Sequence, residues 1–381
     1  MNSSLSEQFW KESKTGDKYI RLANSVGQEW LFPIKHIRAY LSLFQPSSIA
    51  GKLVAILLPL FSKYPRLLQQ LHAEYVYIEC SAALQDLLNK TFRIEGVQYA
   101  IFCGSPGKHQ KPTLLLSNGQ APLGYCKISN NPSVIEIFEK ESKFLDYLNG
   151  LGMTGIPQVL YCNHIPGNDD IYCFIQTTKR PSRRVKIATI QSPALHSFVQ
   201  SMATKTLVHL RYEESDFYSI IENLKKLLPL LNNTNQETNI HTSIKTIENA
   251  FSGKVSSFCA YHGDLTPWNS FIVDGALFAF DFEYARYTCP LWADLFHFFT
   301  QDLIYNRYAD SEYIYKTYIR LKGSVFRSIT ECDILYISYL LMIIEFYLNR
   351  DQGILNKRLG KCICIWSDLL DRINKICVTI V

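Results

Sequence analysis

The sequence predicts an α+β protein of two lobes, in which a β-rich lobe is followed by a mainly helical one. Between Val97 and Thr178, short apolar runs alternate with Gly, Pro and Asn turns, which is the pattern of consecutive strands. After Lys186, apolar residues recur every three to four positions, which is the period of helices packed on a core. At 381 residues the chain is long enough for two or three such lobes or domains.

The β-rich lobe is expected to contain five strands and one long helix. A hairpin signal, Ser117-Asn118-Gly119, separates the second strand from the third. The helix runs from about Pro132 to Asn149, and Gly150 follows as its C-cap. The expected strands are 99–102, 113–116, 123–128, 158–162 and 171–176.

The later part of the chain is expected to be mainly helical. Good candidates are 193–210, 217–231 and 238–251, and the Asn- and Thr-rich segment 230–239 between two of them is expected to be an exposed loop. Two other runs, Leu53–Phe61 and Ile334–Leu348, are apolar but shorter than the ~20 residues that cross a bilayer. Both are interpreted as core helices.

We divide the sequence into three segments. Residues 1–90 form an N-terminal extension of unassigned role, with a short strand candidate at Glu29–Ile34 and a helical pattern from Leu67. Residues 91–178 form the β-rich lobe, and residues 179–381 the helical lobe.

Composition excludes several classes of protein. Hydrophobic residues make up 47% and charged residues 19%, an ordinary globular balance that argues against disorder. The formal charge of +5 and the lack of a long basic block give no support to a nucleic-acid role. The most basic stretch, Lys179–Lys186, is a solvated loop or a patch that binds an anionic substrate.

The cysteines and the N-terminus indicate a cytoplasmic protein. The 11 cysteines are scattered without a CxxC pair, so they fit neither a zinc site nor a disulfide framework, and buried free thiols explain them. The sequence begins without the basic and apolar regions of a signal peptide.

The chemistry is concentrated in the stretch Tyr261–Asn269 (YHGDLTPWN) and in Phe280–Tyr284 (FDFEY). The Asp274-Gly275 turn predicts a hairpin between them, which brings the strand leaving Asn269 beside the strand that reaches Asp281. The carboxylate of Asp281 and the amide oxygen of Asn269 are suitable ligands for Mg²⁺. Asp264 can accept a proton from an attacking hydroxyl, as phosphoryl transfer requires.

HGDLTPWN followed by FDFEYA resembles the aminoglycoside phosphotransferase and choline kinase superfamily of small-molecule kinases, which share a protein-kinase-like fold. The resemblance covers roughly residues 97–300. It implies that Asp264 is the catalytic base and that His262 braces the loop. It also implies that Asp294, in LWADLF, supports the loop from a helix N-terminus. Glu283 replaces the glycine of a DFG motif, and it contacts either the metal or only the substrate.

The same resemblance assigns a nucleotide site to the β-rich lobe. Lys127 would hold the α- and β-phosphates, paired with Glu141 on the following helix or, alternatively, with Glu139. The other nucleotide-binding candidates are the glycine-rich loop, with Gly104, Ser105 and Gly107, and the hinge to adenine, with Gln176 and Thr178.

Together these features predict an ATP- and Mg²⁺-dependent kinase of a small metabolite. The acceptor is left open among amino alcohols, sugars, amino sugars and aminoglycosides, since the aromatic residues after Glu283 suit either a cation or a sugar ring. A nucleotide-binding pseudokinase is the alternative, and a protein kinase is disfavoured because no activation-loop insert separates Asp281 from Asp294. We expect no nucleic-acid partner and no membrane span.

Overall fold

Leu114, Leu115 and Leu116 are consecutive in one strand, and all three are fully buried. Because side chains alternate between the faces of a sheet, this strand must be covered on both sides. Leu114 and Leu116 belong to one hydrophobic cluster and Leu115 to another. The sheet that contains them therefore separates two cores.

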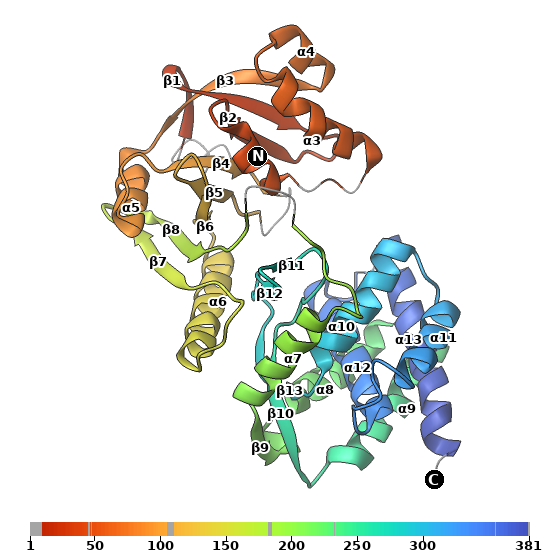
Figure 1. Ribbon diagram of the computed structural model, residues 1–381. Coiled ribbons are helices and arrows are strands. Elements are labelled where there is room, and N and C mark those ends of the chain that lie inside the picture. The colour runs from red at the N-terminus through yellow and green to blue at the C-terminus, as the bar shows by residue number, and fades with distance from the viewer. Residues whose placement is uncertain are drawn as a thin grey trace. The chain divides into compact units, whose positions relative to one another are not determined.

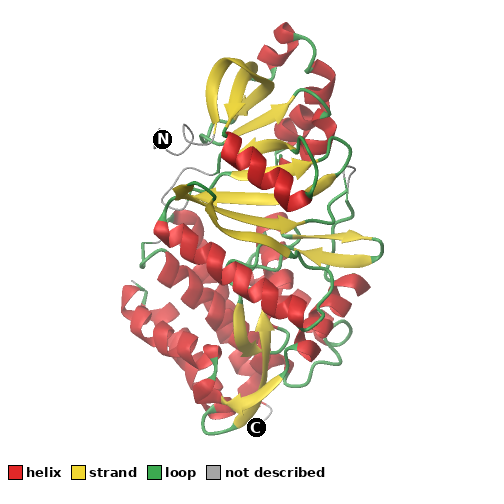
Figure 2. Cartoon of the chain, turned by 90° about the vertical axis from the view of Figure 1, so that its left-hand side faces the viewer, coloured by secondary structure: helices red, strands yellow, loops and turns green. Residues whose placement is uncertain are grey.

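The computed structural model describes residues 10–44, 46, 48–104, 110–181, 185–231, 233–354 and 356–379. The chain divides into two compact units, the first made of the residues up to Gly150 with Ile156–Lys186, and the second of Leu151–Gly155 with Ile187 onward. Strands dominate the first unit and helices the second (Figures 1 and 2). The predicted α+β class with a β-rich and a helical part is confirmed.

The first unit is built on one antiparallel sheet of eight strands, in the order β3-β1-β2-β4-β5-β6-β8-β7. The bounds are β1 Trp10–Ala23, β2 Glu29–Pro33, β3 Ala73–Cys80, β4 Gln98–Phe102, β5 Thr113–Ser117, β6 Pro122–Ser129, β7 Val159–Ile165 and β8 Asn168–Thr177.

Helices lie on both faces of this sheet. Leu84, Leu87 and Leu88 of one helix belong to the first cluster, whereas Leu58 and Leu68 of two others belong to the second. The bounds are α2 Ile37–Tyr40, α3 Ile49–Phe61, α4 Pro65–Gln70, α5 Ala82–Phe92 and α6 Pro132–Gly150, with a 3₁₀ turn at Leu41–Leu43.

The five predicted strands and the predicted long helix of the β-rich lobe are confirmed as β4 to β8 and α6. The first 90 residues contain more strand than the sequence predicts. The predicted strand is present as β2, but β1 and β3 join it, and β2 also pairs with β4 through Trp30 and Phe102. Residues from Trp10 onward thus continue the sheet that carries Lys127.

The second unit packs seven helices around two small sheets among its described residues. Its elements are α7 Pro193–Lys205, β9 Val208–Arg211, α8 Asp216–Leu227, α9 Thr234–Phe251, β10 Val255–Tyr261, β11 Ser270–Val273, β12 Ala276–Ala279, β13 Arg286–Pro290, α10 Ala293–Gln301, α11 Ser311–Lys322, α12 Cys332–Arg350 and α13 Lys357–Thr379. Short 3₁₀ turns lie at Tyr212–Glu214 and Leu228–Leu230, and a π-helical turn at Asp302–Asn306.

Two predictions for this unit were wrong at their boundaries. The segment 230–239 is not a loop throughout, because the Asn233 side chain accepts hydrogen bonds from the backbone of Asn235 and Gln236 and starts α9 at Thr234. The helix predicted for 193–210 ends at Lys205, since Val208 to Arg211 pair with β10 as a strand.

The two apolar runs have different positions in the fold. α12 is long and apolar enough to span a membrane, but it is mostly buried in the second unit against α8, α9 and α13, as a core helix. The interpretation of Leu53–Phe61 as a core helix was wrong. In α3 only one face packs on the sheet, and Leu53, Ile56 and Leu60 are exposed.

Candidate functional site

The loop from His262 to Asn269 follows strand β10 and is held by a close backbone approach at Gly263. Its φ is +88°, and a Cβ at this position would lie 2.4 Å from the carbonyl oxygen of Tyr284. Any side chain would therefore force the loop away from the segment after Asp281. The glycine of the HGD sequence is thus required by the geometry.

His262 joins this loop to the end of the neighbouring hairpin. Its Nδ1 accepts a hydrogen bond from the backbone N–H of Asp264 at 3.2 Å, and its Nε2 donates to the carbonyl oxygen of Phe280 at 3.2 Å. Burial lowers the pKa of His262 to about 3, so the ring is neutral and has the tautomer that both contacts need. The imidazole is placed as a brace between Asp264 and the residue before Asp281.

Asp294 fixes the same loop from the start of α10. Its Oδ2 accepts the backbone N–H of His262 at 2.9 Å, and its side chain is buried. Burial raises the pKa of the Asp294 carboxyl to about 7, while the backbone amides of His262 and Gly263 act in the opposite direction. The sequence predicts that Asp294 supports the loop from a helix N-terminus, and its hydrogen bond with His262 is a contact of this kind.

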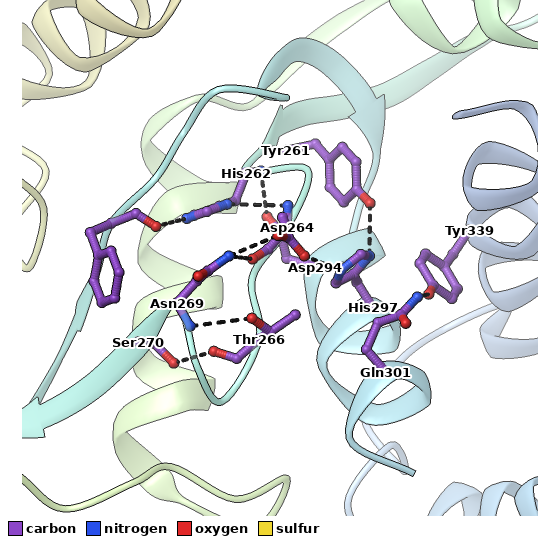
Figure 3. Close-up of polar contacts among 11 residues, drawn as sticks. Tyr261, His262, Asp264, Thr266, Asn269, Ser270, Asp294, His297, Gln301 and Tyr339 are labelled. Carbon is purple, nitrogen blue, oxygen red and sulfur yellow. Dashed lines mark hydrogen bonds and ion pairs between the residues drawn. The ribbon is translucent and has the colours of Figure 1, made fainter. Parts of the chain in front are cut away.

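Both carboxylate oxygens of Asp264 accept hydrogen bonds (Figure 3). Oδ2 lies 2.8 Å from Nδ2 of Asn269, and Oδ1 lies 3.1 Å from Nε2 of His297. The side chain is still 32% exposed, so a ligand can reach it. Asp264 is therefore oriented on two sides and open on another, as a proton-accepting carboxylate must be.

Asn269 is oriented by its amide nitrogen. Nδ2 donates to the carboxylate and to the backbone oxygen of Asp264, which leaves the amide oxygen as the atom suited to a metal. Its backbone N–H bonds to Thr266, and its carbonyl oxygen accepts the N–H of Phe280 at 3.1 Å. The backbone of Asn269 thus lies next to the residue that precedes Asp281.

The hairpin between these residues forms as the sequence predicts. Asp274 and Gly275 both have positive φ, as the tight turn requires, and Ser270 of β11 pairs with Ala279 of β12. Asp281 follows with φ +71°, a left-handed conformation that aspartate tolerates better than most residues. Glu283 lies beyond Phe282 and beside the phenol of Tyr284.

In the first unit, Lys127 pairs with Glu141. The distance from Nζ to Oε2 is 2.7 Å, Lys127 is 6% exposed, and Glu141 is fully buried. The competing candidate, Glu139, instead accepts a hydrogen bond from the Tyr172 hydroxyl. Phe138 packs on Phe174 with their ring centroids 5.9 Å apart, and this contact helps to hold α6 against β8.

Gln176 lies on the same face of the sheet as Lys127. In the register of β6 and β8, Tyr125 faces Gln176 and Lys127 faces Phe174, so the four side chains share one face. Gln176 is 3% exposed, and its Oε1 is buried without a hydrogen-bond partner among the described residues. A buried acceptor of this kind is suited to a ligand that donates a hydrogen bond.

Of the other nucleotide candidates, Gly104 follows strand β4 and Thr178 follows strand β8. Gly104 has φ +84°, and Ser105 and Gly107 of the predicted glycine-rich loop lie outside the described residues. At the predicted hinge, the backbone N–H of Thr177 bonds to Gln158 and that of Thr178 to Leu123. These two amides are thus engaged within the sheet.

His297 also contacts Asp264, although the sequence did not predict it as a site residue. It is buried, and its Nδ1 lies 3.2 Å from the hydroxyl of Tyr261 while Nε2 contacts Asp264. A neutral ring with hydrogen on Nε2 satisfies both contacts, since the Tyr261 hydroxyl then donates to Nδ1. The available signal was its place three residues after Asp294, one turn further along α10.

The aromatic residues after Glu283 are divided between core and surface. Phe296, Phe298 and Phe299 are buried in α10, and Phe296 stacks on Tyr336. These three therefore belong to the core and are not available to an acceptor.

A different aromatic group lies beside the Asp264 loop. The rings of Trp268 and Tyr305 are 5.8 Å apart, and the guanidinium of Arg358 lies 4.6 Å from the Tyr305 ring. Tyr305 is carried by the π-helical turn after α10, a type of irregularity that often re-aims side chains at functional sites.

A second arginine, Arg350, lies against Tyr347, which is itself near Asp264. Burial raises the pKa of the Tyr347 phenol, and the Asp264 carboxylate adds to that shift, so the two groups are within electrostatic range. The guanidinium of Arg350 lies 4.6 Å from the Tyr347 ring. We call Trp268, Tyr305, Tyr347, Arg350 and Arg358 the aromatic–arginine group.

A metal site built from protein side chains alone is absent from the described residues. Among the described residues, no group of three or more His, Cys, Asp or Glu side chains is placed to hold a metal ion.

No protein-family model matches the sequence, and no curated protein sequence matches it. Solved structures with similar folds include aminoglycoside phosphotransferases and an amicoumacin kinase. The aminoglycoside phosphotransferase APH(2'')-Ib with bound ADP is 16% identical, covers 76% of this chain and 97% of its own, and has a TM-score of 0.44. The amicoumacin kinase hAmiN, in complex with AMP-PNP, Ca²⁺ and amicoumacin, is 13% identical, covers 72% of this chain and 86% of its own, and has a TM-score of 0.42.

A third such structure is the streptomycin–ATP complex of APH(2'')-IIa. It is 17% identical, covers 73% of this chain and 92% of its own, and has a TM-score of 0.44.

Proposed function

We propose that the chain is an ATP- and Mg²⁺-dependent phosphotransferase that acts on a hydroxyl group of a small metabolite. One observation carries the proposal: the Asp264 carboxylate is held by Asn269 and His297 and remains open to a ligand. This is the arrangement required of a base that orients an acceptor hydroxyl.

In this proposal Asp264 accepts the proton of the acceptor hydroxyl as the hydroxyl oxygen attacks the terminal phosphorus of ATP. The bond from that phosphorus to the bridging oxygen breaks, and ADP leaves. Asn269, through its amide oxygen, and Asp281, through its carboxylate, would hold the metal. When bound, Mg²⁺ neutralises the charge of the phosphates. His262 and Asp294 keep the loop in place and exchange no proton with the substrate.

Lys127 is proposed to bind the α- and β-phosphates of ATP, oriented by Glu141. The unpartnered Oε1 of Gln176 on the same sheet face suits the amino group of adenine, which is a hydrogen-bond donor. The expected contact of adenine with backbone groups of Gln176, Thr177 and Thr178 would then use groups other than the N–H of Thr177 and of Thr178, since these two already bond within the sheet. A cytoplasmic location agrees with the supply of ATP.

The aromatic–arginine group supports a hydroxyl-rich ring as the acceptor. The ring of Trp268 is 37% exposed and offers a face for stacking. Arg358 disfavours a polycation such as an aminoglycoside, since like charges repel, and it suits hydroxyl or anionic substituents, whereas the charge of Arg350 is already paired with Asp351. We therefore favour a sugar or sugar derivative without several positive charges.

The test is ADP release with a panel of acceptors: hexoses, sugar acids, amino sugars, aminoglycosides, choline, ethanolamine and thiamine. We expect turnover with a neutral or acidic sugar, and a loss of at least about a thousandfold in kcat for Asp264→Asn with binding of Mg-ATP preserved. Asp274→Asn is the matched control, because this aspartate lies in the turn of the hairpin that follows the Asp264 loop, is exposed and has a turn conformation that asparagine also adopts.

Two results would contradict the proposal. Turnover by Asp264→Asn at the wild-type rate would remove the assigned base. Binding of Mg-ATP in a thermal-shift assay, without ADP release for any acceptor, would favour a pseudokinase.

A further inference from the structure

Helix α3 carries a stripe of exposed apolar side chains. Ile49, Leu53, Ile56 and Leu60 are spaced by four, three and four residues, so they lie on one face of the helix. Their exposed fractions are 79%, 53%, 65% and 53%. The exposed Tyr64 follows shortly after the helix ends. The stripe is on the order of 500 Å², a size at which an apolar patch on a monomer is often functional.

The opposite face of α3 is fixed to the fold. Leu58 is fully buried, and Val54, Leu57 and Phe61 pack on the core that lies under this side of the sheet. The Ser48 hydroxyl caps the helix by accepting the N–H of Gly51, and α4 lies beside α3 (Figure 1). The exposed stripe is therefore a stable surface of the first unit, because the buried face holds the helix in one orientation.

The segment around α3 has a formal net charge of +5, which equals the formal net charge of the whole chain. From Trp30 to Ala73 the sequence has five lysines and arginines and no aspartate or glutamate. The whole chain has 39 Lys and Arg and 34 Asp and Glu, so the rest of the chain has 34 of each and is neutral. All five cations are exposed: Lys35, Arg38, Lys52, Lys63 and Arg66.

This charge bears on what covers the stripe. A second copy of the chain would bring five further cations to the contact, and the stripe falls short of the ~800 Å² per partner that a stable interface usually buries. An anionic bilayer supplies an apolar layer and negative head groups together, and it adapts to a convex ridge without a matching groove. The charge and the shape of α3 therefore favour a membrane surface.

We propose that α3 and the basic segment Trp30–Ala73 bind the surface of an anionic membrane. The helix lies in the plane of the interface, with Ile49, Leu53, Ile56 and Leu60 at the boundary between head groups and acyl chains. Lys52 lies beside the stripe, and Lys63 follows the helix, where both can contact lipid phosphates. The 13 residues of α3 extend about 20 Å, too short for a ~30 Å hydrocarbon core, so the association is peripheral.

The proposal goes beyond the phosphotransferase assignment and does not depend on it. It would place the enzyme next to acceptors or products that are attached to lipid or made at the membrane.

The first experiment is sedimentation of the full chain with vesicles of 70% phosphatidylcholine and 30% phosphatidylglycerol. We expect binding at 0.1 M salt that weakens at 0.5 M, and at least tenfold weaker binding to pure phosphatidylcholine. Ile49→Gln/Ile56→Gln should weaken binding at least tenfold, whereas Ile354→Gln, at an equally exposed isoleucine of the second unit, should not. Thermal melting checks that each variant is folded.

Two further double variants test where the positive charge must lie. Both change the net charge of the chain by the same amount. Lys63→Glu/Arg66→Glu should weaken binding at least tenfold. Lys140→Glu/Lys143→Glu should have little effect, since it changes two exposed cations of the same spacing on α6. Equal binding by the two pairs would overturn the proposal, because it would show attraction by overall charge alone.

Insertion of the helix can be followed directly. The tryptophan added by Ile56→Trp should shift its emission to the blue when the anionic vesicles are added, measured as the difference from wild type. The tryptophan added by Ile354→Trp should not. Absence of wild-type binding to these vesicles would overturn the proposal. So would sedimentation velocity that shows a dimer dissociated by Ile49→Gln/Ile56→Gln, because the stripe would then be covered by a second copy.

Discussion

Nε2 of His297 lies 3.1 Å from Oδ1 of Asp264, and this contact joins the loop after β10 to helix α10. The other ring nitrogen of His297 bonds to the Tyr261 hydroxyl, so the orientation of the imidazole is set from both sides. The opposite oxygen of Asp264 is held by Asn269. The carboxylate therefore has little freedom to rotate, and His297 is proposed as a positioning residue.

Replacement of His297 should lower the rate of the chemical step more than it affects ATP binding. We expect His297→Leu to reduce kcat about tenfold to a hundredfold with the KM for ATP nearly unchanged, because a misplaced reacting group can cost a hundredfold. His297→Gln, which can still donate to Asp264, should recover part of the loss. A kcat of His297→Leu equal to that of wild type would refute the assignment.

The buried pair of Lys127 and Glu141 should be sensitive to removal of one partner. Lys127→Met leaves a carboxylate in a fully buried position, and we expect a loss of about 3–5 kcal/mol in the free energy of unfolding. Lys127→Met/Glu141→Leu should recover most of the stability, measured by denaturant unfolding, without restoring ATP affinity.

The matched control for this pair is Lys316→Met. Lys316 forms an exposed pair with Glu312 one helical turn away, so its loss should cost less than about 0.5 kcal/mol. If the double variant bound ATP as tightly as wild type, Lys127 would have a structural role only.

The carboxyl of Asp294 should make stability depend on pH. Its pKa is raised to about 7 in the fold from about 3.9 in the unfolded chain, so folding favours the protonated form. Its contribution to stability is present below pH ~4 and is lost as the pH rises toward 7. The melting temperature of wild type minus that of Asp294→Asn should therefore fall between pH 4 and 7.

The melting temperatures of wild type and Asp294→Asn must be compared at each pH, because His262 changes the stability of both proteins with pH in the opposite direction. Its pKa is lowered to about 3, so its contribution is present above pH ~6.5 and is lost as the pH falls. A difference that stayed constant from pH 4 to 7 would show that Asp294 is ionised in the fold throughout this range.

Metal binding should depend on Asp281. We expect Asp281→Asn to raise the Mg²⁺ concentration for half-maximal activity at least about tenfold, since the amide retains an oxygen ligand but loses the charge. Asparagine also tolerates the positive φ of this position, so the backbone should be retained. Removal of metal with EDTA should abolish turnover. An unchanged Mg²⁺ requirement in Asp281→Asn would transfer the ligand role elsewhere, with Glu283 as the first candidate.

The local parts of the site could be predicted from the sequence. The Asp274-Gly275 turn specifies the hairpin, and the hairpin alone brings Asn269 beside Phe280. Glu141 was favoured over Glu139 because of its position on α6, which is also a local property. These features depend on residues close together in the chain, where turn chemistry and helical period decide the outcome.

Contacts between distant segments could not be predicted in the same way. His297 reaches Asp264 across 33 positions, and its place one helical turn after Asp294 does not by itself specify this contact. β1 pairs with β3 at Tyr19 and Val76, far apart in the chain, and the charged residues of β1 hide its strand character. α3 was misjudged because a run of apolar residues gives no information on which of its faces is covered.

The pairing of β2 with β4 also sets a limit on how the chain can be dissected. A fragment that began near residue 92 would retain all the proposed site residues but would leave β4 with an uncovered row of backbone N–H and C=O groups. Such an open edge recruits strands from other molecules, so the shortened protein would be prone to aggregate. Residues 10–80 thus protect an edge of the sheet that carries Lys127, and expression trials should keep them.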